Sequence, residues 1–138
     1  MESLKVQDYM NKRPVTFTEK MPVAEAVERL LISHQKGGPV VNADHKLVGF
    51  LSEQDCLKQM IESSYYREQV AKVSEIMRRE VLTVKPYDSV LALAEKMVGA
   101  RPKIYPVVDD NGLLLGTISR SDVLKAIDVQ LQDGYKKH

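Results

Sequence analysis

Two turns in this sequence carry residue types that could bind a phosphorylated sugar. The pattern Gly-x-x-Ser-x-x-Asp occurs at residues 49–55 and again at residues 116–122. The start of a helix offers unpaired N–H groups and a partial positive charge, which attract phosphate. A carboxylate beside that helix start can accept hydrogen bonds from both hydroxyls of a ribose. The glycine that begins each pattern allows close approach of a flat base or of another backbone.

The same residues also fit a purely structural role. Ser-x-x-Asp before an apolar run is a capping arrangement for a helix N-terminus, and such boxes are common. A cap explains the serine, but it does not require glycine, aspartate and a preceding Pro-Val-Val segment to recur together. Both interpretations stay open at this point.

The recurrence has its origin in a duplication of the chain. A shift of 67 residues lays residues 6–58 over residues 73–125 without a gap, and 15 of the 53 paired positions are identical. Chance would give about three identities. We therefore predict two pseudo-symmetric units, residues 1–66 and 67–138, which are too small to stand alone and must share a core.

Each unit is predicted to have the order strand, helix, strand, strand, helix, in an α+β fold. Apolar residues recur with helical period from Val23 to Leu31 and from Val90 to Val98, which indicates helices with one buried face. Turn residues at 42–45 and 109–112 predict two hairpins. The predicted strands are residues 15–17, 39–41 and 47–51, and residues 82–84, 106–108 and 114–118. The remaining predicted helices are residues 53–62 and 120–128, with a helical connection from 70 to 77.

The composition is that of an ordinary globular protein. Hydrophobic residues make up 43% and charged residues 28% of the chain, and 20 basic against 19 acidic residues leave a net charge of +1. No overall field attracts nucleic acid or anionic lipid. The sequence has no apolar run near the roughly 18 residues of a membrane span. We expect a cytoplasmic protein with no nucleic-acid or membrane partner.

The residues that could support catalysis are few and scattered. Cys56 is the single cysteine, so the chain can form no internal disulfide, and a metal site based on cysteine would lack ligands. His34, His45 and His138 share no spacing with Cys56 that suggests a metal site or a nucleophile and base. Cys56 is interpreted as a small packed side chain. We expect no enzyme activity, no metal and no required cofactor.

Taken together, the duplicated Pro-Val-Val strand and Gly-x-x-Ser-x-x-Asp turn resemble a tandem pair of cystathionine-beta-synthase (CBS) domains, also called a Bateman module. The resemblance covers residues 6 to about 126. It implies two units packed through their sheets, with two clefts between them that bind AMP, ADP, ATP or S-adenosylmethionine. It also implies a regulatory role, a homodimer and, since we expect no fused effector domain, a separate effector protein. The alternative is a dimerisation scaffold that needs no ligand.

The resemblance also assigns roles to individual positions in the two clefts. The residues implied at the ribose are Asp55 and Asp122, and those implied at the phosphate or ribose are Ser52 and Ser119. Residues of the first strand and the start of the Pro-Val-Val strand are implied to line the adenine pocket. In the first unit these are Val15, Thr16 and Gly38, and in the second unit they are Leu82, Thr83, Tyr105 and Pro106.

The two copies differ where charge and shape should matter. Arg120 follows the second motif serine, whereas Glu53 follows the first, and arginine can meet a phosphate that glutamate would repel. Tyr105 offers an aromatic wall that Gly38 cannot. We therefore expect the cleft with Asp122 to bind more tightly.

Several other bases near the motifs are expected to be solvated surface charges, although each could reach a phosphate. They are Lys36, Arg101, Lys103 and the pair Arg78 and Arg79.

Overall fold

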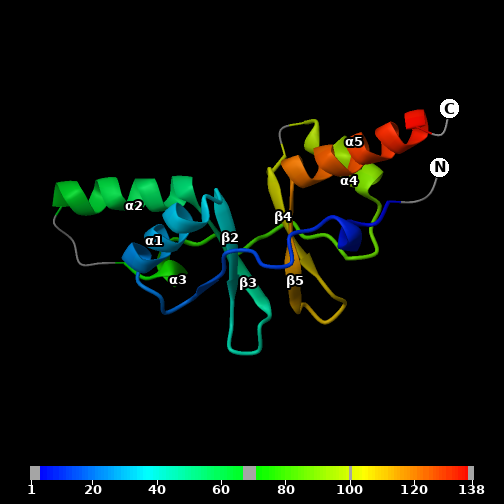
Figure 1. The fold of residues 1–138 in the computed structure, drawn as a ribbon. Helices are drawn as coiled ribbons and strands as arrows, with labels where there is room; N and C mark the ends of the chain where they lie inside the picture. The colour runs from blue at the N-terminus through cyan, green and yellow to red at the C-terminus, as the bar shows by residue number, and fades with distance from the viewer. Residues whose placement is uncertain (1–3, 67–70, 100, 137–138) are drawn as a thin grey trace. The chain divides into compact units, whose positions relative to one another are not determined.

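The computed structural model describes residues 4–66, 71–99 and 101–136. It contains helices and two small sheets, which confirms the α+β class (Figure 1). Contacts divide the chain into two compact units. The first-repeat unit comprises Pro14–Val81 and Gly112–Leu114, and the second-repeat unit comprises Met1–Arg13, Leu82–Asn111 and Leu115–His138.

The first-repeat unit is built on a three-stranded sheet. Its elements are β1 (Phe17–Thr18), α1 (Val23–Ser33), β2 (Gly37–Val41), β3 (Leu47–Ser52), α2 (Glu53–Tyr66) and α3 (Val73–Ile76). β1 pairs parallel with β2, and β2 pairs antiparallel with β3, as the predicted hairpin requires. β1 begins later than predicted because the Val15 N–H donates to the Gln35 side chain, at 3.0 Å, instead of to a strand.

The second-repeat unit repeats the order helix, strand, strand, helix. Its elements are η1 (Val6–Asp8), α4 (Val90–Met97), β4 (Ile104–Val108), β5 (Leu114–Ser119) and α5 (Arg120–Lys136). Val84 forms a parallel bridge with Val107, which is the counterpart, 67 residues on, of the pair Phe17 and Val40 in the other unit. The predicted strand at 82–84 is thus reduced to this one bridge.

The helices begin as predicted, but their ends and outer faces differ from expectation. α2 and α5 continue past residues 62 and 128 to Tyr66 and Lys136. Of the predicted buried stripes, Leu31 and Val98 are exposed, because Leu31 lies at the edge of the buried face of α1 and α4 ends at Met97. The predicted connecting helix is shortened to α3, and residue 70 lies outside the described residues.

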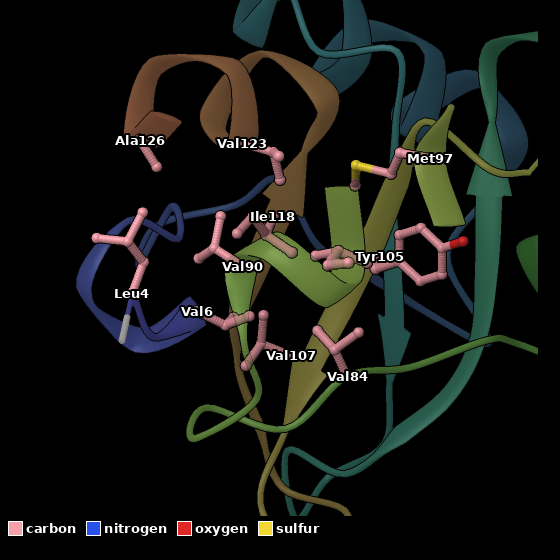
Figure 2. Close-up of a cluster of buried hydrophobic side chains, with 11 residues drawn as sticks. Leu4, Val6, Val84, Val90, Met97, Tyr105, Val107, Ile118, Val123 and Ala126 are labelled. Carbon is pink, nitrogen blue, oxygen red and sulfur yellow. The ribbon is translucent and has the colours of Figure 1, made fainter. Parts of the chain in front are cut away.

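The predicted shared core is wrong, because each unit has its own hydrophobic core. Each core includes the segment that precedes the other repeat. Figure 2 shows Leu4 and Val6 packed with Val90, Val107 and Ile118 of the second-repeat unit. In the first-repeat unit the equivalent residues Ala71 and Val73 pack with residues of β1, α1, β2 and β3. Val6 and Val73 are both 0% exposed, so each is a full member of its core.

Matching hydrogen bonds hold these leading segments in place. Val6 N–H donates to Asp88 O at 3.0 Å, and its counterpart Val73 N–H donates to Met21 O at 2.9 Å. The boundary predicted between residues 66 and 67 divides the two sequence repeats rather than the two compact units, and it stays a prediction. The contacts show that each repeat supplies its leading segment to the core of the other.

None of the helices in the described ranges has the length and apolar character needed to cross a membrane.

Candidate functional site

The first motif turn joins β3 to α2 and forms a reciprocal helix cap. Ser52 Oγ accepts from the Asp55 N–H at 3.1 Å, and Asp55 Oδ2 accepts from the Ser52 N–H at 3.1 Å and from the Ser52 hydroxyl at 2.8 Å. This is the capping box that the sequence pattern allowed. The cap uses one carboxylate oxygen of Asp55, Oδ2, and the second oxygen, Oδ1, takes no part in it.

The second motif turn joins β5 to α5 and is capped in the same way. Ser119 Oγ accepts from the Asp122 N–H at 3.2 Å, and Asp122 Oδ2 accepts from the Ser119 N–H at 2.9 Å. Within the described part of the chain, Asp122 Oδ1 has no partner, and the Ser119 hydroxyl donates to no acceptor. This turn therefore keeps both an acceptor and a donor for a ligand.

The helix starts offer fewer free N–H groups to an anion than the sequence suggested. The first helical N–H of each helix is already used, because Glu53 N–H donates to Lys36 O and Arg120 N–H donates to Lys103 O, both at 2.9 Å. The third N–H belongs to the cap. Among the first three helical N–H groups, those of Gln54 and Ser121 remain for a ligand in the described structure.

The motif glycines are positions of close backbone approach. A Cβ on Gly116 would lie 2.4 Å from Asn11 O, and one on Gly49 would lie 2.9 Å from Arg78 O. Asn11 and Thr117 exchange backbone hydrogen bonds of 2.7 and 3.0 Å, and Arg78 and Phe50 exchange two of 2.9 Å. Of the two roles that the sequence left open for glycine, the structure shows approach of a second backbone.

The other predicted site residues of the first-repeat unit lie together. A Cβ on Gly38 would lie 2.3 Å from Val15 O, so only glycine fits where these two segments cross. Gly38 is buried, and Val15 and Thr16 are half-buried. Thr16 O accepts from Arg29 Nη1 at 3.0 Å.

In the second-repeat unit the predicted residues divide into exposed and buried ones. Leu82 and Thr83 are exposed, whereas Pro106 is fully buried. Tyr105 is 3% exposed and belongs to the core, where Figure 2 shows its ring beside Met97 and Val84. Its role as an aromatic wall stays a prediction, since the ring is covered by the core in this structure.

Arg78 is a charge whose partner the sequence did not reveal. Its Nε lies 3.7 Å from Asp55 Oδ1, and the two side chains are 64% and 16% exposed, respectively. The equivalent position in the other unit is Asn11, whose Oδ1 accepts from the Arg13 N–H at 2.9 Å. Lys36, Arg101, Lys103 and Arg79 are exposed, as expected.

A polar cleft of about 330 Å³ lies beside Asp55. Its lining residues are Asp55, Lys58, Gln59, Glu62, Glu75 and Ile76. Three carboxylates against one ammonium make this cleft a poor place for a phosphate.

The candidate nucleophile is unsuited to catalysis. Cys56 is buried, and burial, followed by the charges of Asp55 and Glu53, raises its pKa to about 11. The thiol therefore stays protonated at neutral pH, when the thiolate would be the reactive form. His34 and His45 are exposed, and His138 lies outside the described residues. No three His, Cys, Asp or Glu side chains within the described ranges are grouped to hold a metal ion.

The family model of the CBS domain matches this chain twice, over residues 6–62 and 73–129. The chain belongs to the CBS domain family. The two matched ranges are the two repeats, so the duplication and the predicted resemblance are confirmed, and the capped turns are the equivalent turns of two CBS domains.

Similar proteins include both short and much longer chains. An uncharacterized protein of Methanocaldococcus jannaschii, MJ1426, is 27% identical over 156 residues, covering 91% of this chain and 92% of its own. The A-adding tRNA nucleotidyltransferase of Aquifex aeolicus is 30% identical over 129 residues, which cover 94% of this chain. The chain spans only 15% of that enzyme and 42% of the M. jannaschii protein MJ1225.

Two of the similar solved structures are complexes with adenosyl compounds. CBSX2 in complex with AMP is 25% identical with a TM-score of 0.79, over 93% of this chain and 98% of its own. The CBS domain pair of MJ0100, in complex with 5′-methylthioadenosine and S-adenosylmethionine, is 26% identical with a TM-score of 0.80, over 94% and 99% of the two chains.

The close contact at the motif glycine leads to a prediction about stability. We expect Gly116→Ala to lower the free energy of unfolding by about 1–3 kcal/mol, because the new methyl group must displace the Asn11 carbonyl. Gly134→Ala is the control: it lies in α5 with open space around it, and it should raise stability by up to about 1 kcal/mol. Urea unfolding measures both. A Gly116→Ala protein as stable as wild type would contradict the backbone contact.

Proposed function

We propose that this chain is a regulatory module that binds an adenosyl ligand at the capped motif turns. The observation that carries the proposal is that only one of the two oxygens of each motif carboxylate takes part in the helix cap. Oδ2 accepts the hydrogen bonds of the helix cap, and Oδ1, which takes no part in the cap, has lone pairs for two hydrogen bonds. At Asp122 this Oδ1 has no partner in the described structure, and at Asp55 it lies 3.7 Å from Arg78 Nε. A ribose diol presents two such donors, so the sugar can bind without loss of the cap.

The ligands of similar structures support the adenosyl class. AMP, 5′-methylthioadenosine and S-adenosylmethionine, bound by CBSX2 and MJ0100, have in common only the adenine base and the ribose ring with its 2′ and 3′ hydroxyls. Recognition of the sugar therefore suits all of them, and AMP, ADP, ATP and S-adenosylmethionine are the candidates for this chain. The proposed output is a change in a separate effector protein in the cytoplasm, with no reaction catalysed by the chain.

The second turn should bind a phosphorylated ligand more tightly than the first. Asp122 Oδ1 and the Ser119 hydroxyl are available there, and the exposed Arg120 adds a positive charge. At the first turn Ser52 donates to Asp55, and Glu53 stands in place of arginine.

Binding is tested by thermal melting and titration calorimetry with AMP, ADP, ATP and S-adenosylmethionine. A ligand at 100 times its Kd should raise Tm by about 8 °C. Asp122→Asn keeps an oxygen for the cap but weakens acceptance from the ribose, and it should weaken AMP binding about tenfold, more than Asp55→Asn does. Asp133→Asn, in the same helix, is the control. No rise in Tm with any ligand would contradict the proposal, and a larger loss in Asp55→Asn would reverse the order of the sites.

Association of two copies is a second candidate function, favoured by an exposed apolar face on α1 and α2. The exposed side chains are Leu31, Ile32, Leu57, Met60 and Ile61. Two apolar grooves of about 370 and 460 Å³ lie along the same helices. Large exposed apolar patches mark interaction sites, and homodimers with two-fold symmetry are the commonest soluble oligomers. We propose that this face binds the same face of a second copy.

The proposed dimer is tested by sedimentation velocity. Ile32 is 78% exposed, so Ile32→Asp should leave folding intact while it places two charges in the dimer interface and converts dimer to monomer. Ala43→Asp, at an exposed position in the loop between β2 and β3, should stay dimeric. A wild-type protein that is monomeric at micromolar concentration would contradict this candidate, whereas a dimer unaffected by Ile32→Asp would place the interface elsewhere.

A further inference from the structure

The two motif turns obtain their positive charge from different elements, and this difference has consequences for ligand choice. At the second turn the cation is Arg120, the first residue of α5, which forms no ion pair with Asp122 in the described structure. At the first turn that position is Glu53, and the cation is Arg78, which approaches Asp55 from the segment paired with β3.

The backbone of Arg78 is fixed, but its side chain is free to change partner. Two backbone hydrogen bonds of 2.9 Å with Phe50 hold the residue beside the turn. The side chain is 64% exposed and its Nε lies 3.7 Å from Asp55 Oδ1, which is longer than a good charge-assisted hydrogen bond. Because the guanidinium is exposed and the contact is long, another anion can replace Asp55 as the partner of Arg78.

Asp55 Oδ1 is the oxygen that a ribose would need. Because Oδ2 is engaged by Ser52, the sugar must share or displace the contact between Oδ1 and Arg78. Displacement leaves a guanidinium next to the bound sugar. The released guanidinium can then pair with a phosphate of the ligand, whereas Glu53, the first residue of α2, would repel one.

We propose that Arg78 is the residue that makes the first turn selective for phosphorylated adenosyl ligands. Without ligand, its guanidinium pairs with Asp55; when the sugar takes Oδ1, the guanidinium turns to the ligand's phosphate. This inference rests on the proposed function of the turns. A phosphate-free ligand such as 5′-methylthioadenosine displaces the guanidinium and offers nothing in return, so it binds the first turn weakly.

The second turn lacks this competition. Asn11, the counterpart of Arg78, turns its side chain to the Arg13 N–H, and Asp122 Oδ1 has no partner among the described residues. A phosphate-free ligand meets no cation that it must displace there. The two turns of one chain should therefore differ in selectivity as well as in affinity.

The test compares AMP and 5′-methylthioadenosine by calorimetry in a parent protein that carries Asp122→Asn, which leaves the first turn as the stronger site. We expect this parent to bind AMP more tightly than 5′-methylthioadenosine. Addition of Arg78→Gln should weaken AMP binding about tenfold and leave 5′-methylthioadenosine binding equal or a few-fold tighter. Arg79→Gln is the matched control, because Arg79 is exposed and its Nη2 donates to Ser74 O at 3.3 Å.

If Arg78 had only a structural role, Arg78→Gln would affect the binding of both ligands in the same way. Equal weakening of both ligands by Arg78→Gln, or the same AMP loss in Arg79→Gln, would overturn the inference and leave the proposed function intact. If the Asp122→Asn parent binds neither ligand while the wild-type protein binds AMP, the inference is also overturned, because binding then occurs only at the second turn. If wild type binds neither, the proposed function itself is wrong.

Discussion

Each motif turn is fixed from two sides by bonds that the chain makes with itself. On one side the aspartate accepts from the serine N–H and the serine accepts from the aspartate N–H, which ties the start of the helix to the end of the strand. On the other side a second backbone lies against the motif glycine. The carboxylate oxygen that the cap does not use is therefore held in position before a ligand arrives, which lowers the ordering cost of binding.

The exchange of leading segments links these turns to the cores. Val6 and Val73 each fill the core of the unit that carries the other repeat, and a few residues further along the chain Asn11 and Arg78 pair with the strands that end in the motifs. A unit of this size buries a small fraction of its surface, so its stability is marginal and depends on every segment of its core. Any displacement of a leading segment would thus disturb both a core and the strand that leads to a capped turn.

Much of the fold could be predicted because the duplication repeats strong local signals. The hairpins, the helix starts and the caps follow from turn residues, periodicity and the Ser-x-x-Asp pattern. The exchange could not be predicted, since Val6 and Val73 are identical and sequence alone does not say which copy enters which core. The contact of Arg78 with Asp55 depends on that exchange, and the burial of Tyr105 depends on how the core packs around it, so neither follows from local pattern.

The central claim is that one carboxylate oxygen of each motif caps the helix while the other is left for a sugar. A crystal structure of this chain grown with AMP tests it most directly. We predict ribose hydroxyls within hydrogen-bond distance of Asp122 Oδ1, with the Ser119 N–H still donating to Oδ2. A structure with AMP bound away from both motif aspartates, or with the cap broken to reach the sugar, would contradict it.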